Sequence, residues 1–138
     1  MIKDISTSSI NPENLEETLK PFLESLEGKP LFLFFIASDD PATNQPWCPD
    51  VRAALGPVRK AFDEDAREHN FATIRVGVKE EWRNPTNVFR TQWKLQAIPT
   101  LARYSLITVD EQKFPSVRML VEAECLDLAK LHGLMAEE

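Results

Sequence analysis

One candidate reactive cysteine stands out in this chain of 138 residues. Cys48 lies between Trp47 and Pro49, directly before a predicted helix. The unpaired N–H groups and the dipole of a helix N-terminus favour a thiolate over a thiol, and proline is tolerated at the first helical position. Asp50 acts in the opposite sense, because a nearby carboxylate disfavours a second negative charge. We interpret Cys48 as a candidate nucleophile rather than an inert small residue.

The second cysteine, Cys125, lies far along the chain at the start of a predicted helix. It could act on Cys48 as a resolving thiol, which would require the two Cα atoms to approach within about 7 Å. The alternative, which we favour, is a small buried residue, because free cysteine often behaves as a core hydrophobe. Two cysteines make a disulfide scaffold implausible and favour a reducing compartment. His69 and His132 show no metal-ligand spacing, so we expect neither a metal nor a cofactor.

The charge and the apolar content of the chain argue against two classes of partner, nucleic acid and membranes. The chain has 16 Lys and Arg residues, scattered along its length, against 22 Asp and Glu residues, for a net charge of −6. A polyanion would be repelled by this field, so nucleic acid is not expected as a partner. No apolar run approaches the roughly 20 residues needed to cross a bilayer, and the start of the chain lacks a secretory pattern. We expect a cytosolic protein without a membrane partner.

Cys48 is predicted to lie between a buried strand and an amphipathic helix. Residues 31–36 form an unbroken apolar run, which suits a central strand covered on both faces. Residues 38–46 read as a polar loop containing two prolines. After Cys48, apolar residues recur at helical spacing up to Ala66, and Val51 falls on this stripe. The pair Gly56-Pro57 should bend this helix without ending it.

The remaining elements complete an α/β pattern. We expect a flexible arm over residues 1–12 and one domain over 13–138. A helix should start at Asn11-Pro12, since asparagine is a good cap and proline suits the first turn. The later segments are predicted as strands over 71–78, 100–104 and 118–121, helices over 85–93 and 123–135, and a long polar hairpin loop over 108–116. This order implies a central mixed sheet with helices on both faces.

Several motifs resemble those of the small cytosolic thioredoxin-related family of thioredoxin domain-containing protein 17. The Trp-Cys-Pro-Asp segment over 47–50 is similar to the family's active-site turn, and Ile98-Pro99-Thr100 resembles the cis-proline turn of the thioredoxin superfamily. Further similarity covers Val76-Gly77, Phe89-Arg90 and residues 120–126, so that it extends over about residues 13–136.

The resemblance implies a thioredoxin fold and a role in thiol–disulfide exchange, usually as a disulfide reductase. By position, Cys48 would be the attacking cysteine. Ile98, Pro99 and Thr100 would form a groove for an extended substrate chain. The loop over 38–46 would narrow the range of substrates.

The chain departs from the family pattern Trp-Cys-Pro-Asp-Cys, because Val51 stands where the second cysteine is expected. A second thiol normally resolves the mixed disulfide from within the protein, and valine cannot. Valine does suit the apolar stripe of the helix, so packing can survive the change. The loop over 108–116 is also longer than the resemblance implies.

Two functions from different classes follow. The first is a thiol–disulfide oxidoreductase in monothiol mode, in which Cys48 attacks protein or small disulfides and an external thiol, from the thioredoxin reductase or glutathione system, resolves the product. The second is an adaptor that has kept the fold and the cis-proline groove without the chemistry. A peroxiredoxin is a distant third, because that chemistry expects threonine where Gln45 stands.

Overall fold

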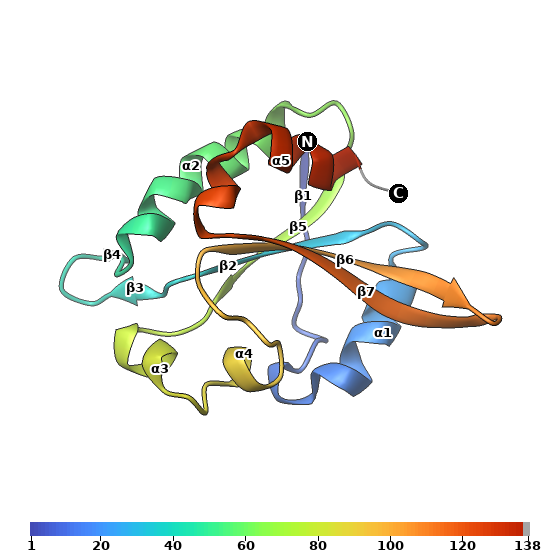
Figure 1. Ribbon diagram of the computed structural model, residues 1–138, viewed down its shortest axis with the longest axis horizontal. Helices are drawn as coiled ribbons and strands as arrows, with labels where there is room; N and C mark the ends of the chain where they lie inside the picture. The colour runs from blue at the N-terminus through green and yellow to red at the C-terminus, as the bar shows by residue number, and fades with distance from the viewer. Residues whose placement is uncertain (137–138) are drawn as a thin grey trace.

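The computed structural model describes residues 1–136 and is organised around a five-stranded mixed sheet of order β1-β5-β2-β6-β7 (Figure 1). Strands β1 and β2 run parallel to β5, whereas β6 is antiparallel to both β2 and β7. The strands of this sheet are β1 (Ile2–Asp4), β2 (Leu31–Ile36), β5 (His69–Arg75), β6 (Thr100–Val109) and β7 (Gln112–Val121). The helices are η1 (Pro12–Asn14), α1 (Leu15–Ser25), α2 (Pro49–Glu64), α3 (Lys79–Arg83), α4 (Val88–Thr91), η2 (Glu122–Leu126) and α5 (Leu128–Ala136).

The central strand β2 is fully buried, as its apolar run predicts. Its side chains pack on both faces of the sheet. The ring of Phe32 packs against that of Phe62 on α2, with centroids 4.9 Å apart, whereas the ring of Phe35 packs on Trp93 at 5.3 Å. Successive strand residues point to opposite faces, so only a strand covered on both sides can be apolar throughout.

Helices cover both faces of the sheet, as predicted. In Figure 1, α2 and α5 lie on one side, and α1, α3 and α4 lie on the other. The strand–helix–strand unit β2-α2-β5 brings two parallel strands side by side and lays α2 across them. This unit fixes the start of α2 at the end of the sheet where β2 finishes. Within residues 1–136 no helix is long and apolar enough to cross a membrane.

The start of the chain does not behave as the predicted free arm. Residues Ile2–Asp4 form an edge strand on β5, and the N–H of Ile5 donates to the carbonyl of Phe71 at 3.0 Å. This pairing uses backbone groups, which a polar sequence supplies as well as an apolar one. The expectation of an unstructured segment over residues 1–12 is therefore wrong for these residues. The predicted cap is confirmed, since Asn11 caps η1 with Pro12 at its first position.

The segment 108–116 is not a long loop. Strands β6 and β7 continue through it and are joined by the two residues Asp110 and Glu111, both with positive φ (50° and 66°). A two-residue hairpin turn with positive φ at both positions has a backbone twist that matches the twist of the two strands it joins. The hairpin projects past the core, so its residues need no buried face, and their polar composition resembles that of a loop. The predicted helix over 85–93 is shorter than expected, since only α4 lies within it, and α3 precedes it as a helix that was not predicted.

Candidate active site

Cys48 is the N-cap residue of α2. Its backbone is extended (φ −92°, ψ 121°), and its carbonyl accepts the first helical hydrogen bond from the N–H of Arg52 at 3.1 Å. Pro49 occupies the first helical position, as predicted. The Cys48 side chain is partly exposed and the thiol is free, so a reagent can reach it. The side chain makes no cap hydrogen bond, so the cysteine occupies the N-cap position without its sulfur being bound to the first turn of α2.

Trp47 fixes the segment that precedes the cysteine. Its indole Nε1 donates to the carbonyl of Gly77 at 3.0 Å, and its backbone N–H donates to the carbonyl of Ser38 at 3.3 Å. The Ser38 hydroxyl accepts from the N–H of Gly77 at 3.0 Å. At Gly77 φ is +117°, and a Cβ there would lie 2.8 Å from the Cβ of Glu81, so the position requires glycine.

The predicted loop over 38–46 forms a small hairpin beside the cysteine. Its strands are β3 (Asp39–Asp40) and β4 (Gln45–Pro46). The guanidinium of Arg52 donates to the carbonyl of Pro46 at 2.5 Å, which ties the hairpin to the first turn of α2. The hairpin thus forms one wall next to Cys48, built from acidic and small residues.

Val51 lies one turn along α2 from Cys48 and is fully buried in the hydrophobic core. The predicted apolar stripe is confirmed as far as Phe62, with Val51, Ala54, Val58, Ala61 and Phe62 all buried, whereas Ala66 is exposed and lies beyond the end of α2. Valine at this position therefore supports the packing of α2, as its size and polarity suggest. Asp50, by contrast, is exposed.

The cis-proline turn lies at the same end of the sheet. The Ile98–Pro99 peptide bond is cis, and the next residue, Thr100, pairs with Phe35 near the end of β2, where the chain leaves toward Cys48. Ile98, Pro99 and Thr100 are buried as whole residues, so little of the turn is exposed to a substrate chain. The Thr100 hydroxyl donates to the carbonyl of Ala97 at 2.7 Å. The role of this turn as a substrate groove stays a prediction.

One backbone contact of this turn was not predicted. The N–H of Glu122 donates to the carbonyl of Pro99 at 2.8 Å, and Glu122 has φ of 53°. That conformation is uncommon for a non-glycine residue, and no local sequence signal marks it. The carboxylate of Glu124 accepts from the N–H of Val121 at 3.0 Å and helps to close the same turn. Together these bonds join the end of β7 to the cis-proline turn.

Cys125 lies within η2 and is fully buried. Its thiol points at backbone carbonyls, with Sγ 3.4 Å from the oxygen of Leu120 and 3.9 Å from that of Pro99. Burial raises the pKa of Cys125 to about 11. The thiol is free, so the structure contains no bond between the two cysteines. These observations agree with a buried small residue behind the turn.

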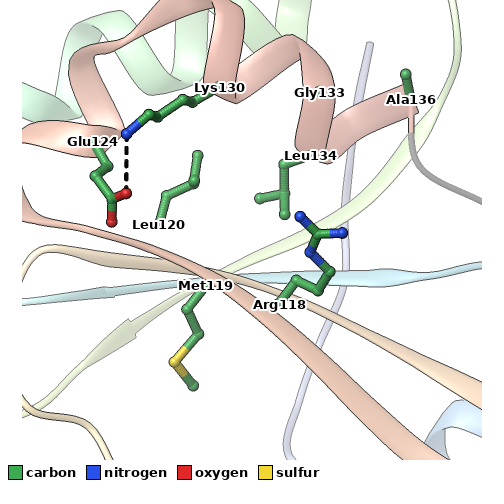
Figure 2. A pocket seen from close by; sticks show the side chains of 8 residues that line it. All are labelled: Arg118, Met119, Leu120, Glu124, Lys130, Gly133, Leu134 and Ala136. Carbon is green, nitrogen blue, oxygen red and sulfur yellow. Dashed lines mark hydrogen bonds and ion pairs between the residues drawn. The ribbon is translucent and has the colours of Figure 1, made fainter.

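Hollows lie on both sides of η2, and Cys48 is not among the residues that line the two described next. The first, of about 150 Å³, is lined by residues of η2 and of the first turns of α2, namely Asp50, Ala53, Glu122, Ala123 and Leu126. The second, of about 620 Å³, lies between α5 and β7 (Figure 2), and neither cysteine is among its lining residues. An ion pair between Lys130 and Glu124 at 3.1 Å spans its edge. Within residues 1–136 no group of three His, Cys, Asp or Glu residues could hold a metal ion.

The sheet order, the cysteine at the start of α2 and the cis-proline turn together define a thioredoxin-like protein. The family profile of the thioredoxin domain of thioredoxin domain-containing protein 17-like proteins matches residues 10–126. The chain belongs to this family.

Curated relatives span most of the chain. A thioredoxin domain-containing protein of Schizosaccharomyces pombe is 39% identical over 118 residues, which are 86% of this chain and 90% of that protein. Human thioredoxin domain-containing protein 17 is 33% identical over 84% of this chain and 85% of its own length. The thioredoxin-like protein Clot of Arabidopsis thaliana is 34% identical over 68% of this chain and 73% of its own.

Proposed function

We propose that this protein is a thiol–disulfide oxidoreductase that works in monothiol mode through Cys48. The observation that carries the proposal is the contrast within one helical turn, where the partly exposed Cys48 occupies the N-cap position of α2 and the fully buried Val51 follows three residues later. The thiolate form of cysteine is the nucleophile in disulfide exchange. The membership of a thioredoxin-like family supports redox chemistry in general terms.

The reaction has two exchanges. The Cys48 thiolate attacks one sulfur of a substrate disulfide, forming a mixed disulfide and releasing the other sulfur as a thiolate that takes up a proton. An external thiolate then attacks the substrate sulfur of the mixed disulfide, and Cys48 leaves as a thiolate. A second external thiol releases the substrate in the same way. The two electrons gained by the substrate come from two external thiols, which end as one disulfide.

Restoring a second thiol tests this proposal. Residues three apart on a helix lie about 5–6 Å apart at Cβ, which is within reach of a disulfide after small adjustments. In Val51→Cys the resolving thiol is intramolecular, so in a single turnover without glutathione the mixed disulfide should be resolved, releasing the reduced substrate and leaving a disulfide between residues 48 and 51 that two glutathione thiols later reduce. The wild type should stop at the mixed disulfide until glutathione is added. The measurement is the release of the substrate thiol after protein and disulfide substrate are mixed, with the protein-bound species identified by mass spectrometry.

Two variants control for the change in packing. Val51→Ala and Val51→Ser also make the buried site smaller but supply no thiol, so they should stop at the mixed disulfide as the wild type does. Cys48→Ser should form no mixed disulfide in any background. A Val51→Cys variant that folds and forms the mixed disulfide but does not release the substrate would contradict the proposal that only the resolving step is missing.

The proposed substrates are protein or small disulfides, and the electron donor is an external thiol supplied by the glutathione or thioredoxin reductase system. We place the protein in the cytosol, because such a donor must be maintained in reduced form. Nucleic acid and membranes are not partners in this proposal. The net charge of −6 supports the first exclusion.

A second candidate function rests on the full burial of Val51. The packing of α2 is complete without a second thiol, so the fold can serve as a binding module at the cis-proline turn. In that case Cys48→Ala should bind a partner protein as tightly as the wild type does. A covalent complex trapped by the wild type and lost in Cys48→Ala would favour the oxidoreductase instead.

A further inference from the structure

An apolar groove runs along α2 away from Cys48. One stripe of α2 lines it, with spacings of three and four residues that keep one helix face in line. This stripe consists of Asp50, Ala53, Pro57, Lys60 and Glu64. The opposite wall is η2 and the start of α5, which pack beside α2 on the same face of the sheet (Figure 1). The hollow of about 150 Å³ at its near end and one of about 850 Å³ farther on share Leu126.

The groove exposes apolar side chains that the fold does not use. Leu126 is 46% exposed and Leu128 is 58% exposed, and both line the larger hollow. Gly56, on the α2 wall, has open space where a Cβ would be. Glycine and proline in a helix interior cost about 1 and 3 kcal/mol relative to alanine, and Gly56 and Pro57 are adjacent here. Gly56 thus leaves space on this wall of the groove, and the pair Gly56-Pro57 lowers the stability of the helix.

The charges along the groove are mostly negative. Asp50 and Glu122 flank its near end, beside the reactive cysteine. At the far end both carboxylates are paired with cations, Glu64 with Lys60 at 3.9 Å and Asp65 with Arg67 at 2.7 Å. The excess negative charge of the groove therefore comes from Asp50 and Glu122 at its near end.

We propose that this groove, lined by Leu126 and Leu128, binds an extended segment of the disulfide substrate that carries leucine-like side chains flanked by lysine or arginine. The inference rests on the proposed function, because it takes Cys48 as the point of attachment. From Asp50 to Lys60 the helix rises about 15 Å at 1.5 Å per residue. An extended chain covers that distance in about four or five residues. The apolar residues of the substrate therefore lie four or five positions from its cysteine.

Activated peptides test the groove. Each probe holds one cysteine as a mixed disulfide with 5-thio-2-nitrobenzoate, and attack by Cys48 on the peptide sulfur releases this coloured thiolate. The first probe carries two leucines at the fourth and fifth positions from its cysteine, between lysines. The second replaces the leucines by serines. Burial of leucine side chains gives about 1.5–3 kcal/mol each, so the leucine probe should react about tenfold faster or more. Probes with the extension on either side of the cysteine cover both chain directions.

Matched variants locate the effect. In Leu126→Ser and Leu128→Ser the ratio of the leucine rate to the serine rate should fall to about one. Val109→Ser is the control, since Val109 is 50% exposed but lies at the tip of the β6–β7 hairpin, outside the groove, and should keep the full ratio. A ratio near one in the wild type, or a full ratio in both groove variants, would overturn the proposal. Replacing the lysines of the probe by glutamates should lower the rate.

A binding measurement separates this inference from the proposed chemistry. The leucine peptide with serine in place of its cysteine is labelled with a fluorophore and titrated with the Cys48→Ser protein by anisotropy. Binding that is lost in Leu128→Ser supports the groove even if Cys48 proves unreactive toward both probes. Absence of binding together with equal probe rates would refute the groove while leaving the proposed exchange intact. A concentration-dependent dimer in sedimentation that Leu128→Ser abolishes would assign the groove to a second copy of the chain instead.

Discussion

The two cysteines of this protein occupy opposite environments at one end of the sheet. Cys48 occupies the N-cap position of α2, is partly exposed and makes no side-chain hydrogen bond to the helix. Cys125 is fully buried in η2, and its thiol faces backbone carbonyls. Burial raises the pKa of Cys125 to about 11, which keeps it protonated at neutral pH. Position in the fold, rather than residue type, therefore separates a candidate nucleophile from a structural thiol.

The difference between the two cysteines also shows how the cis-proline turn is held in place. The carbonyl of Pro99 accepts from the N–H of Glu122 at 2.8 Å, and the Cys125 thiol lies 3.9 Å from the same oxygen. The buried cysteine thus supports the cis-proline turn, while the exposed one is available for exchange. If this division is correct, reactivity should follow Cys48 and stability should follow Cys125.

The largest expected effect is selective labelling. Burial raises the pKa of Cys125 to about 11, so this thiol carries almost no thiolate at neutral pH, and burial also protects it from reagents. Iodoacetamide should therefore label one thiol of the native protein, and Cys48→Ser should remove this fast labelling. The measurement is the rate of carbamidomethylation of each cysteine, followed by mass spectrometry of the digested protein.

Denaturant supplies the control for that experiment. In unfolded protein both thiols should react at similar rates, because the burial of Cys125 is lost. Fast labelling of Cys125 in the folded Cys48→Ser variant would mean that η2 opens readily, and the contrast between the two cysteines would fail.

The next effect is a loss of stability in alkali. Because the fold holds the pKa of Cys125 at about 11, above the unfolded value, the neutral thiol is favoured in the folded state. Its contribution is complete below the unfolded pKa and is lost as pH rises toward 11. Between the unfolded pKa and the folded pKa, each pH unit lowers the free energy of unfolding by about 1.4 kcal/mol. The wild type should therefore lose about 2 kcal/mol by pH 10 through the thiol of Cys125.

Comparison with Cys125→Ala isolates that loss. Burial also raises the pKa of Tyr104, but this residue is present in both proteins and its effect cancels in the difference. Urea unfolding at a series of pH values gives the free energy of unfolding of each protein. A difference between them that does not change with pH would show that the thiol of Cys125 is not protected by the fold.

The sequence predicted the parts of the fold that depend on burial. The apolar run over 31–36 and the stripe that starts at Val51 both appear as expected, because packing against the core fixes their periodicity. Elements outside the core were missed. Residues Ile2–Asp4 pair through backbone groups, and the β6–β7 hairpin extends where no face needs to be apolar, so side-chain patterns carry little information there.

The same limit applies to the site. The position of Cys48 at the start of α2 follows from local signals, namely the proline after it and the helical stripe beyond. The contact between Glu122 and Pro99 joins residues far apart in the sequence and uses a backbone conformation that glutamate rarely adopts. The groove along α2 depends on how η2 and α5 pack beside that helix. Only the assembled fold reveals such contacts.

The smallest expected effect is on stability at neutral pH, and it should be the reverse of the effect on reactivity. Cys125→Ala removes a fully buried sulfur and leaves a small cavity, so the free energy of unfolding should fall by about 1–2 kcal/mol. Cys48→Ala removes a partly exposed sulfur whose side chain makes no cap hydrogen bond, so the change should stay within about 0.5 kcal/mol. Urea unfolding of the two variants at pH 7 measures both values. Equal losses at the two positions would mean that Cys48 also serves the packing of α2, because an exposed sulfur without a hydrogen bond has no other way to stabilise the fold.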